Sequence, residues 1–349
     1  MRSFYPDAEQ PPSPRWFPDV IHSYGCELTP RQGLGYGFLG IGGEDGASEV
    51  SQSLKPVLMT SPLSKLGLGS GQFGLDQPTT ARGRPREAEA RDILAIAARS
   101  GLQVFEASRH SESAELALGR VMPRPNPFRI TLTTVRPDRG PDYAEAEVRA
   151  QLLRLGVDAC ETMLAPSATD LLSPAGPKLW DRLRQLKDEG LCRKIGVSVY
   201  ASDDPVGLSK RFKPDVVQAP ASLLDQRLLI DGTLKTLTEM GIEVQLRSIF
   251  LNGLLFLPPD RAPNHLKAAA GRISRARRLI AEGRSDPLQA ALGFALSRPE
   301  ASSVLVGVAS AAEMSAVIAA ASSPPPDLDW DEMALDDPVA LDPTAWAAA

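Results

Sequence analysis

The stretch Leu179–Val199, LWDRLRQLKDEGLCRKIGVSV, decides the fold class because it contains one complete helix-to-strand unit. Its first part, Leu179–Glu189, has the apolar spacing of an amphipathic helix, and Gly190 follows where a left-handed residue ends a helix. Its last part, Lys194–Val199, is a short apolar run typical of a buried strand. A helix followed closely by a buried strand predicts an α/β fold with a parallel sheet.

The same unit recurs on both sides of this stretch. Two further amphipathic patterns, Arg86–Ser100 and Ala144–Leu155, are each followed directly by a glycine. Eight short apolar runs alternate with the helical patterns and are candidate strands: Leu66–Ser70, Val104–Ala107, Phe128–Thr133, Thr162–Ala165, Lys194–Val199, Val216–Gln218, Glu243–Ser248 and Ser303–Val308. Eight alternating units predict a closed (β/α)8 TIM barrel. Before the first strand, residues 56–59 and 63–66 flank Ser61-Pro62 and predict an N-terminal hairpin.

The composition changes at both ends of the barrel region. Residues 1–54 are rich in Pro, Gly and polar residues without helical or strand periodicity, which predicts a largely disordered extension. Residues 55–322 carry the repeated units and form the predicted barrel. Residues 323–349 hold seven acidic residues and no basic one. Such a charge run predicts a solvated acidic tail, the alternative being a handle for a partner or a protease.

Bulk properties exclude several classes of function. The net charge of −5 leaves no general basic surface for nucleic acid. Cys26, Cys160 and Cys192 are too scattered for a disulfide framework or a zinc site, and the three histidines are too dispersed to bind a metal. The chain shows no signal peptide and no apolar run long enough to cross a membrane. We therefore expect a cytoplasmic protein without a metal site.

Five segments carry a resemblance to one enzyme family. Phe105–Gly119, FEASRHSESAELALG, resembles the aldo-keto reductase signature F-D-T-A-x-x-Y-G-x-S-E-x-x-L-G. Gly190–Ser198, Pro214–Gln218, Arg247–Leu255 and Val304–Val308 resemble further motifs of that family in the same order. The resemblance covers about residues 56–320 and implies a barrel that holds a nicotinamide dinucleotide.

The catalytic positions of that family are all substituted in this chain. Its reductases use Asp, Tyr, Lys and His, because hydride delivery leaves an alkoxide that must receive a proton. The matching positions here hold Glu106, Ser111, Thr133 and Ala165, with Thr134 next to the third if the register slips by one. The chain therefore lacks the proton donor, the cation that lowers the pKa of that donor, and the group that orients the carbonyl. This combined loss predicts a pseudoenzyme. The alternative is an active reductase with a rearranged site around Glu106, His110 and Arg247.

The cofactor positions implied by the resemblance are better retained. Ser198 and Gln218 fill the slots that bind the nicotinamide carboxamide, unless they serve only to cap strand ends, and Val199 replaces an Asn. Arg247 replaces a stacking Tyr, and a guanidinium also stacks on aromatic planes. The loop after the seventh strand, residues 248–253, offers backbone N–H groups for the pyrophosphate. The complete candidate set is Gly69, Ser70, Ser198, Gln218, Arg247, Ser248, Phe250, Asn252, Gly253, Gly307 and Glu313.

The resemblance also implies which dinucleotide is preferred. Members that use NADPH place Arg or Lys after the last strand, whereas this chain has Glu313 there and no base within residues 309–314. A carboxylate repels a 2′-phosphate and accepts from a free 2′-hydroxyl, which favours NAD(H) over NADP(H).

The resemblance extends to catalytically inactive members that inhibit cell division and a cell-cycle kinase. It implies protein partners, the division GTPase FtsZ and the histidine kinase DivJ. The C-terminal Ala348-Ala349 resembles tags read by the unfoldase-protease ClpXP, which predicts a short-lived protein. A third reading is a plain scaffold with a vestigial cofactor site.

Overall fold

A computed structural model describes residues 62–73, 85–108, 111–256 and 266–341 of the chain. Eight parallel strands close into a barrel in the order of the sequence. The strands are β1 (Leu66–Gly69), β2 (Val104–Ala107), β3 (Arg129–Thr133), β4 (Cys160–Ala165), β5 (Cys192–Ser198), β6 (Val216–Pro220), β7 (Glu243–Arg247) and β8 (Ala301–Gly307). The (β/α)8 barrel predicted from the alternating units is confirmed, and so are all eight strand positions.

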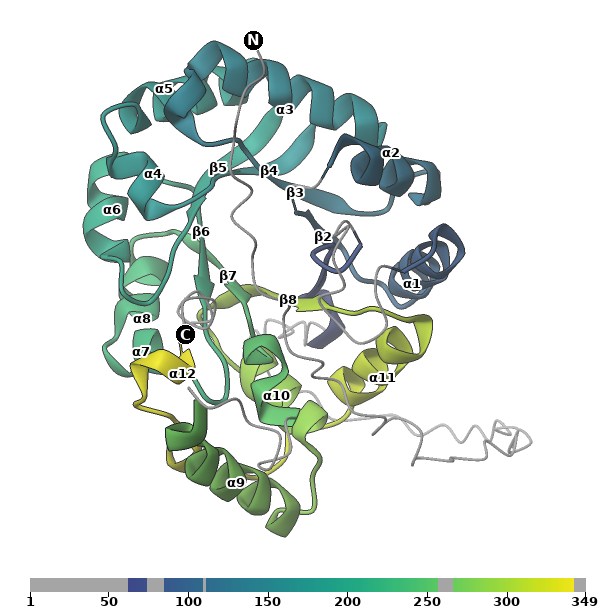
Figure 1. Cartoon of the computed structure of the whole chain (residues 1–349), viewed down its shortest axis with the longest axis vertical. Helices are drawn as coiled ribbons and strands as arrows, with labels where there is room; N and C mark the ends of the chain where they lie inside the picture. The colour runs from purple at the N-terminus through teal and green to yellow at the C-terminus, as the bar shows by residue number, and fades with distance from the viewer. Residues whose placement is uncertain (1–61, 74–84, 109–110, 257–265, 342–349) are drawn as a thin grey trace, which may run out of the picture.

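Helices surround the strands on all sides (Figure 1). The α-helices are α1 (Glu87–Arg99), α2 (Glu112–Val121), α3 (Pro141–Leu155), α4 (Ala168–Leu172), α5 (Gly176–Asp188), α6 (Pro205–Phe212), α7 (Arg227–Ile230), α8 (Thr233–Glu239), α9 (Lys267–Glu282), α10 (Pro287–Leu296), α11 (Ala311–Ser322) and α12 (Pro338–Leu341). The 3-10 segments are η2 (Pro62–Ser64), η3 (Pro137–Arg139), η4 (Leu251–Phe256) and η7 (Asp331–Met333). The three helices predicted from sequence correspond to α1, α3 and α5.

Local sequence signals place these elements. Gly156 and Gly190 have φ values of 68° and 83°, the left-handed conformation expected just beyond a helix end. The helices then pack apolar faces on the barrel: Trp180 of α5 is 2% exposed, and its indole N–H donates to the Phe212 carbonyl at 2.8 Å. The carboxylate of Asp215 accepts from the Ile195 N–H at 2.8 Å, which holds the start of β6 against β5.

The predicted N-terminal hairpin is corrected in its second arm. Residues 56–61 lie outside the described part of the chain, as does the whole extension 1–54. Pro62 to Ser64 form the 3-10 segment η2, and Leu66 already pairs in parallel with Val304 of β8. The fixed φ of a proline favours such a turn, so residues 63–65 are not a hairpin strand.

The prediction of a solvated acidic tail holds for most acidic side chains of residues 323–341, which are exposed, but not for the apolar side chains between them. Met333, Leu335 and Leu341 are 1%, 5% and 3% exposed, because this segment packs across α10 and the barrel. The rings of Trp330 and Phe294 meet edge to face, with their centroids 5.7 Å apart. In Figure 1, α12 lies beside α7 and α8 and far from α11, the α-helix that precedes it in the sequence.

Backbone and charge contacts fix the same segment. The Leu335 N–H donates to the Leu224 carbonyl at 2.8 Å, and Arg227 donates to the Leu341 carbonyl at 3.2 Å. Helix α9 supplies the counter-charges: Arg275 pairs with Glu332 at 2.8 Å, and Arg272 pairs with Asp336. A helix distant in sequence therefore pairs with two of the acidic residues of this segment. Residues 342–349, with the terminal alanines, lie outside the described part.

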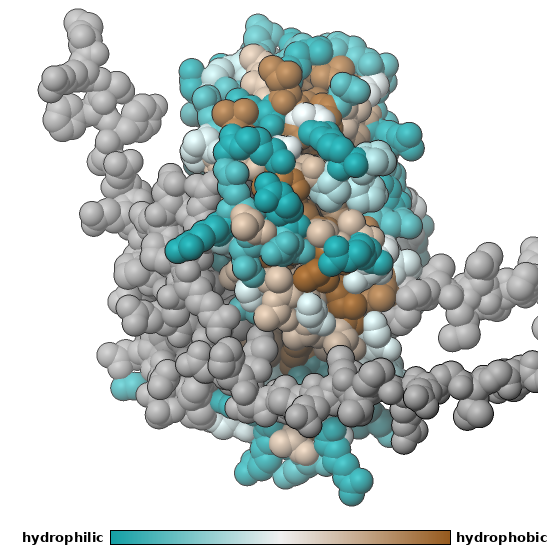
Figure 2. Space-filling model, turned by 90° about the vertical axis from the view of Figure 1, so that its right-hand side faces the viewer, coloured by the Kyte–Doolittle hydropathy of each residue, from teal (hydrophilic) through white to brown (hydrophobic). Residues whose placement is uncertain are grey.

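The surface is of mixed polarity on the side where α1 and α11 lie (Figure 2). No helix in the described part of the chain is long and apolar enough to span a membrane. The same residues contain no cluster of three or more His, Cys, Asp or Glu side chains positioned to hold a metal ion.

Candidate functional site

The C-terminal ends of the strands form the candidate site, as they do throughout (β/α)8 barrels. Strand register brings the predicted residues together there. Gly69 pairs with Glu106 on one side and with Gly307 on the other. Ser198 pairs with Gln218 across β5 and β6. A Cβ added to Gly69 would come within 3.4 Å of Glu106 Oε2, so the glycine keeps the backbone beside this carboxylate open.

Glu106 is a partly buried carboxylate in a hydrogen-bonded loop junction. The Ser108 hydroxyl donates to its Oε2 at 2.7 Å, and the Ser70 hydroxyl accepts from the Ser108 N–H at 2.9 Å. Burial raises the pKa of Glu106, while the Ser108 hydrogen bond and the charge of Arg247 oppose that shift. His110, the proposed substitute for the proton donor, lies outside the described residues.

Arg247 extends from the end of β7 across the mouth of the barrel. Its guanidinium carbon lies 4.7 Å from the centroid of the Tyr200 ring, and Nη2 donates to the Val199 carbonyl at 2.8 Å. Nη1 bonds to the Ser248 hydroxyl at 3.2 Å, whereas Nε is buried without a partner. Burial lowers the pKa of Arg247. These contacts hold the guanidinium in place at the mouth of the barrel, with Nε buried away from any ligand.

The structure also places the other three positions that the sequence resemblance aligns with catalytic residues, Ser111, Thr133 and Ala165. Ser111 is the exposed residue before α2, and its hydroxyl lies 3.1 Å from that of Ser113. Thr133 ends β3 and is partly buried, whereas the Thr134 hydroxyl next to it donates to a backbone carbonyl at 3.1 Å. Ala165 ends β4 and is fully buried. A primary hydroxyl, a secondary hydroxyl and a methyl group thus lie at the positions for which the sequence resemblance implied a phenol, an ammonium and an imidazole.

Ser198 and Gln218 form a polar pair at the ends of neighbouring strands. The Ser198 hydroxyl donates to Gln218 Oε1 at 3.1 Å, and Gln218 is 6% exposed. The bond orients the glutamine side chain, whose amide N–H groups are then the donors of the pair. This geometry is compatible with holding a carboxamide and with simple capping of the strand ends.

The loop after β7 has the backbone shape of an anion-binding turn. Ser248, Leu251 and Gly253 have φ values of 59°, 44° and 84°, and such left-handed residues turn successive N–H groups toward one side. The Gly253 N–H, however, donates to the Phe250 carbonyl at 2.8 Å and is engaged within the loop. Asn252 belongs to the same segment, η4.

Glu313 has a structural role that the sequence prediction did not include. It is 5% exposed, its Oε2 accepts from the Ala309 N–H at 2.7 Å, and its own N–H donates to the Ser310 hydroxyl at 3.1 Å. Ser310 and Glu313 thus cap the start of α11 as in a capping box, with Glu313 bonding the N–H of the residue before the N-cap. Glu89 of α1 adds a second carboxylate, which accepts from the Ala311 N–H at 2.6 Å. Two carboxylates therefore lie at the N-terminus of α11, the place where the resemblance implies that the 2′-position of the dinucleotide binds.

Three residues of the site were missed from sequence. Tyr200 stacks on Arg247, Ser108 hydrogen-bonds Glu106, and Glu89 reaches α11 from α1. The spacing Ser-x-x-Glu at 310–313 was a readable signal for the capping box. The contacts of Tyr200 and Glu89 depend on tertiary packing and leave no local signature.

Comparisons with known proteins agree with this geometry. Residues 65–334 match the Aldo/keto reductase family. Among solved structures, aldo-keto reductase AKR11C1 from Bacillus halodurans (holo form) is similar, with a TM-score of 0.62 and 20% identity over 77% of this chain and 89% of that one. The structure of PA4992 from Pseudomonas aeruginosa is also similar, with a TM-score of 0.54 and 19% identity over 74% of this chain and 89% of that one. No curated protein matches the chain.

Proposed function

Because this chain belongs to the aldo/keto reductase family, we propose that it binds NAD(H) at the C-terminal end of its barrel and acts through protein partners without reducing carbonyl compounds. The observation that carries this proposal is the chemistry of the four catalytic positions, Glu106, Ser111, Thr133 and Ala165. A serine hydroxyl without a neighbouring cation is a poor acid at neutral pH, and the methyl group of Ala165 cannot orient a carbonyl.

The cofactor residues support binding more than they support turnover. The Ser198–Gln218 pair offers amide donors, and the Arg247 guanidinium lies over the Tyr200 ring beside them. A bound nicotinamide dinucleotide would supply a hydride, and its carboxamide would meet the amide donors of Gln218. The contacts fit such a ligand without requiring any reaction of it.

The carboxylates at α11 support a preference for NAD(H). A 2′-phosphate placed near that helix terminus would meet Glu313 and Glu89, whereas a 2′-hydroxyl can donate to a carboxylate. The test is Glu313→Gln, because glutamine retains the capping box and removes one charge. The ratio of NADPH to NADH dissociation constants should fall. An unchanged ratio in this variant and in Glu89→Gln would reject the electrostatic explanation.

The regulatory role rests on a finer resemblance, to the cell-division and kinase inhibitor KidO. It predicts FtsZ and DivJ as partners, and capture of both by the full-length protein, with and without NADH, is the corresponding experiment. The terminal Ala348-Ala349 predicts degradation by ClpXP. Replacing both alanines with Asp should lengthen the half-life several-fold and leave NADH affinity unchanged; equal decay rates would exclude the tag.

A second function, a reductase with a rearranged site, is favoured by Glu106. Burial raises the pKa of this carboxyl, and a carboxyl that stays protonated at higher pH can act as a general acid. Turnover assays separate the two functions. Under the main proposal, an aldehyde and ketone panel gives no NADH or NADPH oxidation above background. Steady turnover that is abolished in Glu106→Gln or in His110→Ala would establish the rearranged reductase.

A further inference from the structure

Two cysteines that are far apart in the sequence begin neighbouring strands of the barrel. Cys160 is the first residue of β4 and Cys192 is the first residue of β5, and the two are paired in the strand register. Both are free thiols. Neighbouring strands lie about 4.7–4.9 Å apart, and the Cα atoms of a disulfide are usually about 4.4–6.8 Å apart. The fold therefore places these cysteines at a separation at which a disulfide can close.

The side chain of Cys160 is directed toward β5. Its thiol donates to the carbonyl of Leu191, the residue before Cys192, with 3.6 Å between the sulfur and the oxygen. The Cys160 N–H donates to the same carbonyl at 3.0 Å, which holds the starts of the two strands against each other. Residues paired on neighbouring strands direct their side chains to the same face of a sheet. The two sulfur atoms can therefore meet by rotation of the side chains.

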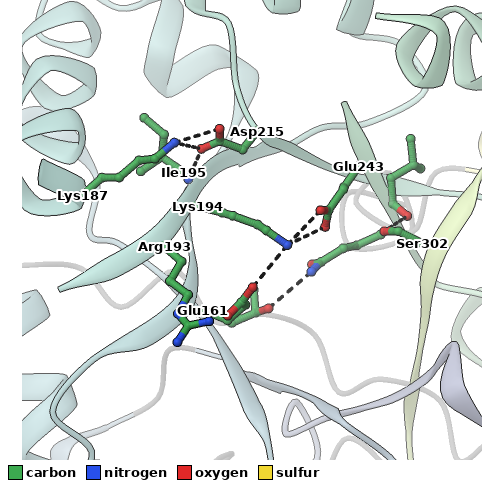
Figure 3. A network of polar contacts seen from close by, with 11 residues as sticks. Glu161, Lys187, Arg193, Lys194, Ile195, Asp215, Glu243 and Ser302 are labelled. Carbon is green, nitrogen blue, oxygen red and sulfur yellow. Dashed lines mark hydrogen bonds and ion pairs between the residues drawn. The ribbon is translucent and has the colours of Figure 1, made fainter. Parts of the chain in front are cut away.

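The two thiols have unlike electrostatic surroundings. The interaction with Cys160 lowers the pKa of Cys192; burial and the charge of Asp215 oppose that shift, and the ammonium of Lys187 supports it. The same interaction, together with burial, raises the pKa of Cys160. Lys187 and Asp215 form an ion pair at 2.6 Å, and Figure 3 shows both side chains beside Ile195 of β5. Cys192 is therefore the thiol that ionises more readily, and the thiolate is the nucleophile in cysteine oxidation.

Both thiols lie just below the surface, where the two strands begin. Cys160 and Cys192 are 4% and 2% exposed, but the chain immediately before them is at the surface, since Asp158, Ala159 and Gly190 are exposed. The end of a strand opens locally at a lower free energy than its centre. Hydrogen peroxide is little larger than water, so a brief opening of the strand starts admits it to the pair.

We propose that Cys160 and Cys192 are a modification site, a dithiol that hydrogen peroxide oxidises to a reversible disulfide between β4 and β5. The Cys192 thiolate attacks one peroxide oxygen and the O–O bond breaks, which leaves a sulfenic acid on Cys192 and a hydroxide that takes up the proton Cys192 had lost. The Cys160 sulfur then attacks the sulfenic sulfur, the S–O bond breaks, and the hydroxyl leaves with the Cys160 proton as a second water. Peroxide gains the two electrons that the thiols lose. Two molecules of a cellular thiol reverse the reaction by exchange and leave as their own disulfide. This chemistry does not depend on the cofactor function proposed above.

The test uses the full-length protein with Cys26→Ser, so that the pair holds the only remaining thiols. After treatment with hydrogen peroxide and blocking of free thiols, trypsin should release peptides 155–178 and 188–193 joined by a disulfide, and dithiothreitol should separate them. In Cys160→Ala, Cys192 should remain as a sulfenic acid and react with dimedone. In Cys192→Ala, oxidation of Cys160 should be at least about tenfold slower than oxidation of Cys192 in the first variant.

Three results would overturn the proposal, with far-ultraviolet circular dichroism confirming in each case that the protein stays folded. Absence of the joined peptides after peroxide treatment would mean that the pair is not oxidised. Joined peptides that form only in urea would mean that the folded barrel keeps the oxidant out or the sulfur atoms apart. Equal oxidation rates in the two alanine variants would remove Cys192 from its role as the attacking thiol.

Discussion

Met333 tests whether the C-terminal segment is part of the folded barrel. Its side chain is 1% exposed, although it stands within a run of acidic residues. Truncating a buried methionine to alanine removes its transfer free energy and leaves a cavity, which together cost about 2–5 kcal/mol. A solvated tail would show no effect of Met333→Ala. The matched control is Val339→Ala in the same segment, where the side chain is 40% exposed and the expected change is within about 0.5 kcal/mol.

Two readouts distinguish loss of docking from loss of the whole fold. Equilibrium unfolding in urea reports the free energy of unfolding of the chain. The decrease in this free energy cannot exceed the free energy with which the segment docks. Amide hydrogen exchange at Leu335, whose N–H donates to the Leu224 carbonyl, reports docking itself. We expect faster exchange at Leu335 in Met333→Ala than in Val339→Ala. Identical exchange and unfolding in the two variants would refute the docked segment.

Three further predictions address the core and the site. Burial raises the pKa of Glu106 above its ordinary value of 4.5, so the charged carboxylate destabilises the fold as pH rises through the folded-state pKa. Glu106→Gln should therefore stabilise the protein most at neutral pH and not at all below pH 4.5. An effect on urea unfolding that does not change with pH would contradict the burial argument. Glu115 is 1% exposed, and its carboxylate lies 2.6 Å from the guanidinium of Arg154. Arg154→Met removes that guanidinium and should lower the free energy of unfolding by about 3–5 kcal/mol in the same assay. A loss below about 1 kcal/mol would show that the other partners of Glu115 suffice. Arg247→Ala removes the guanidinium stacked 4.7 Å from Tyr200 and should weaken NADH about tenfold by calorimetry; equal affinity would remove Arg247 from the cofactor site.

The barrel could be predicted because its signals are local. Helix-ending glycines such as Gly156 and Gly190, and short apolar runs such as Val104–Ala107, set each element from its own residues. The register that joins Ser198 to Gln218 then follows from parallel strands in sequence order. The positions of the candidate residues at strand ends could be predicted for the same reason.

The rest depends on contacts between distant segments. The acidic segment packs because its apolar side chains are buried, with Trp330 against Phe294, and because Arg272 and Arg275 of α9 pair with two of its carboxylates. A count of the segment's own charges contains none of these contacts. Glu313 differs, because its Ser-x-x-Glu spacing is visible in the sequence. The sequence analysis used its charge to predict the preferred dinucleotide and did not include its role in capping α11.

Binding without turnover is measured most directly by a single-turnover experiment. Full-length protein in excess over NADH is mixed with a saturating aldehyde, and the near-ultraviolet absorbance of the bound nicotinamide is followed. The account predicts micromolar NADH affinity, about −8 kcal/mol, with an absorbance that decays no faster than that of free NADH with the same aldehyde. Oxidation of the bound NADH at a rate above that control, or no NADH binding at all, would contradict it.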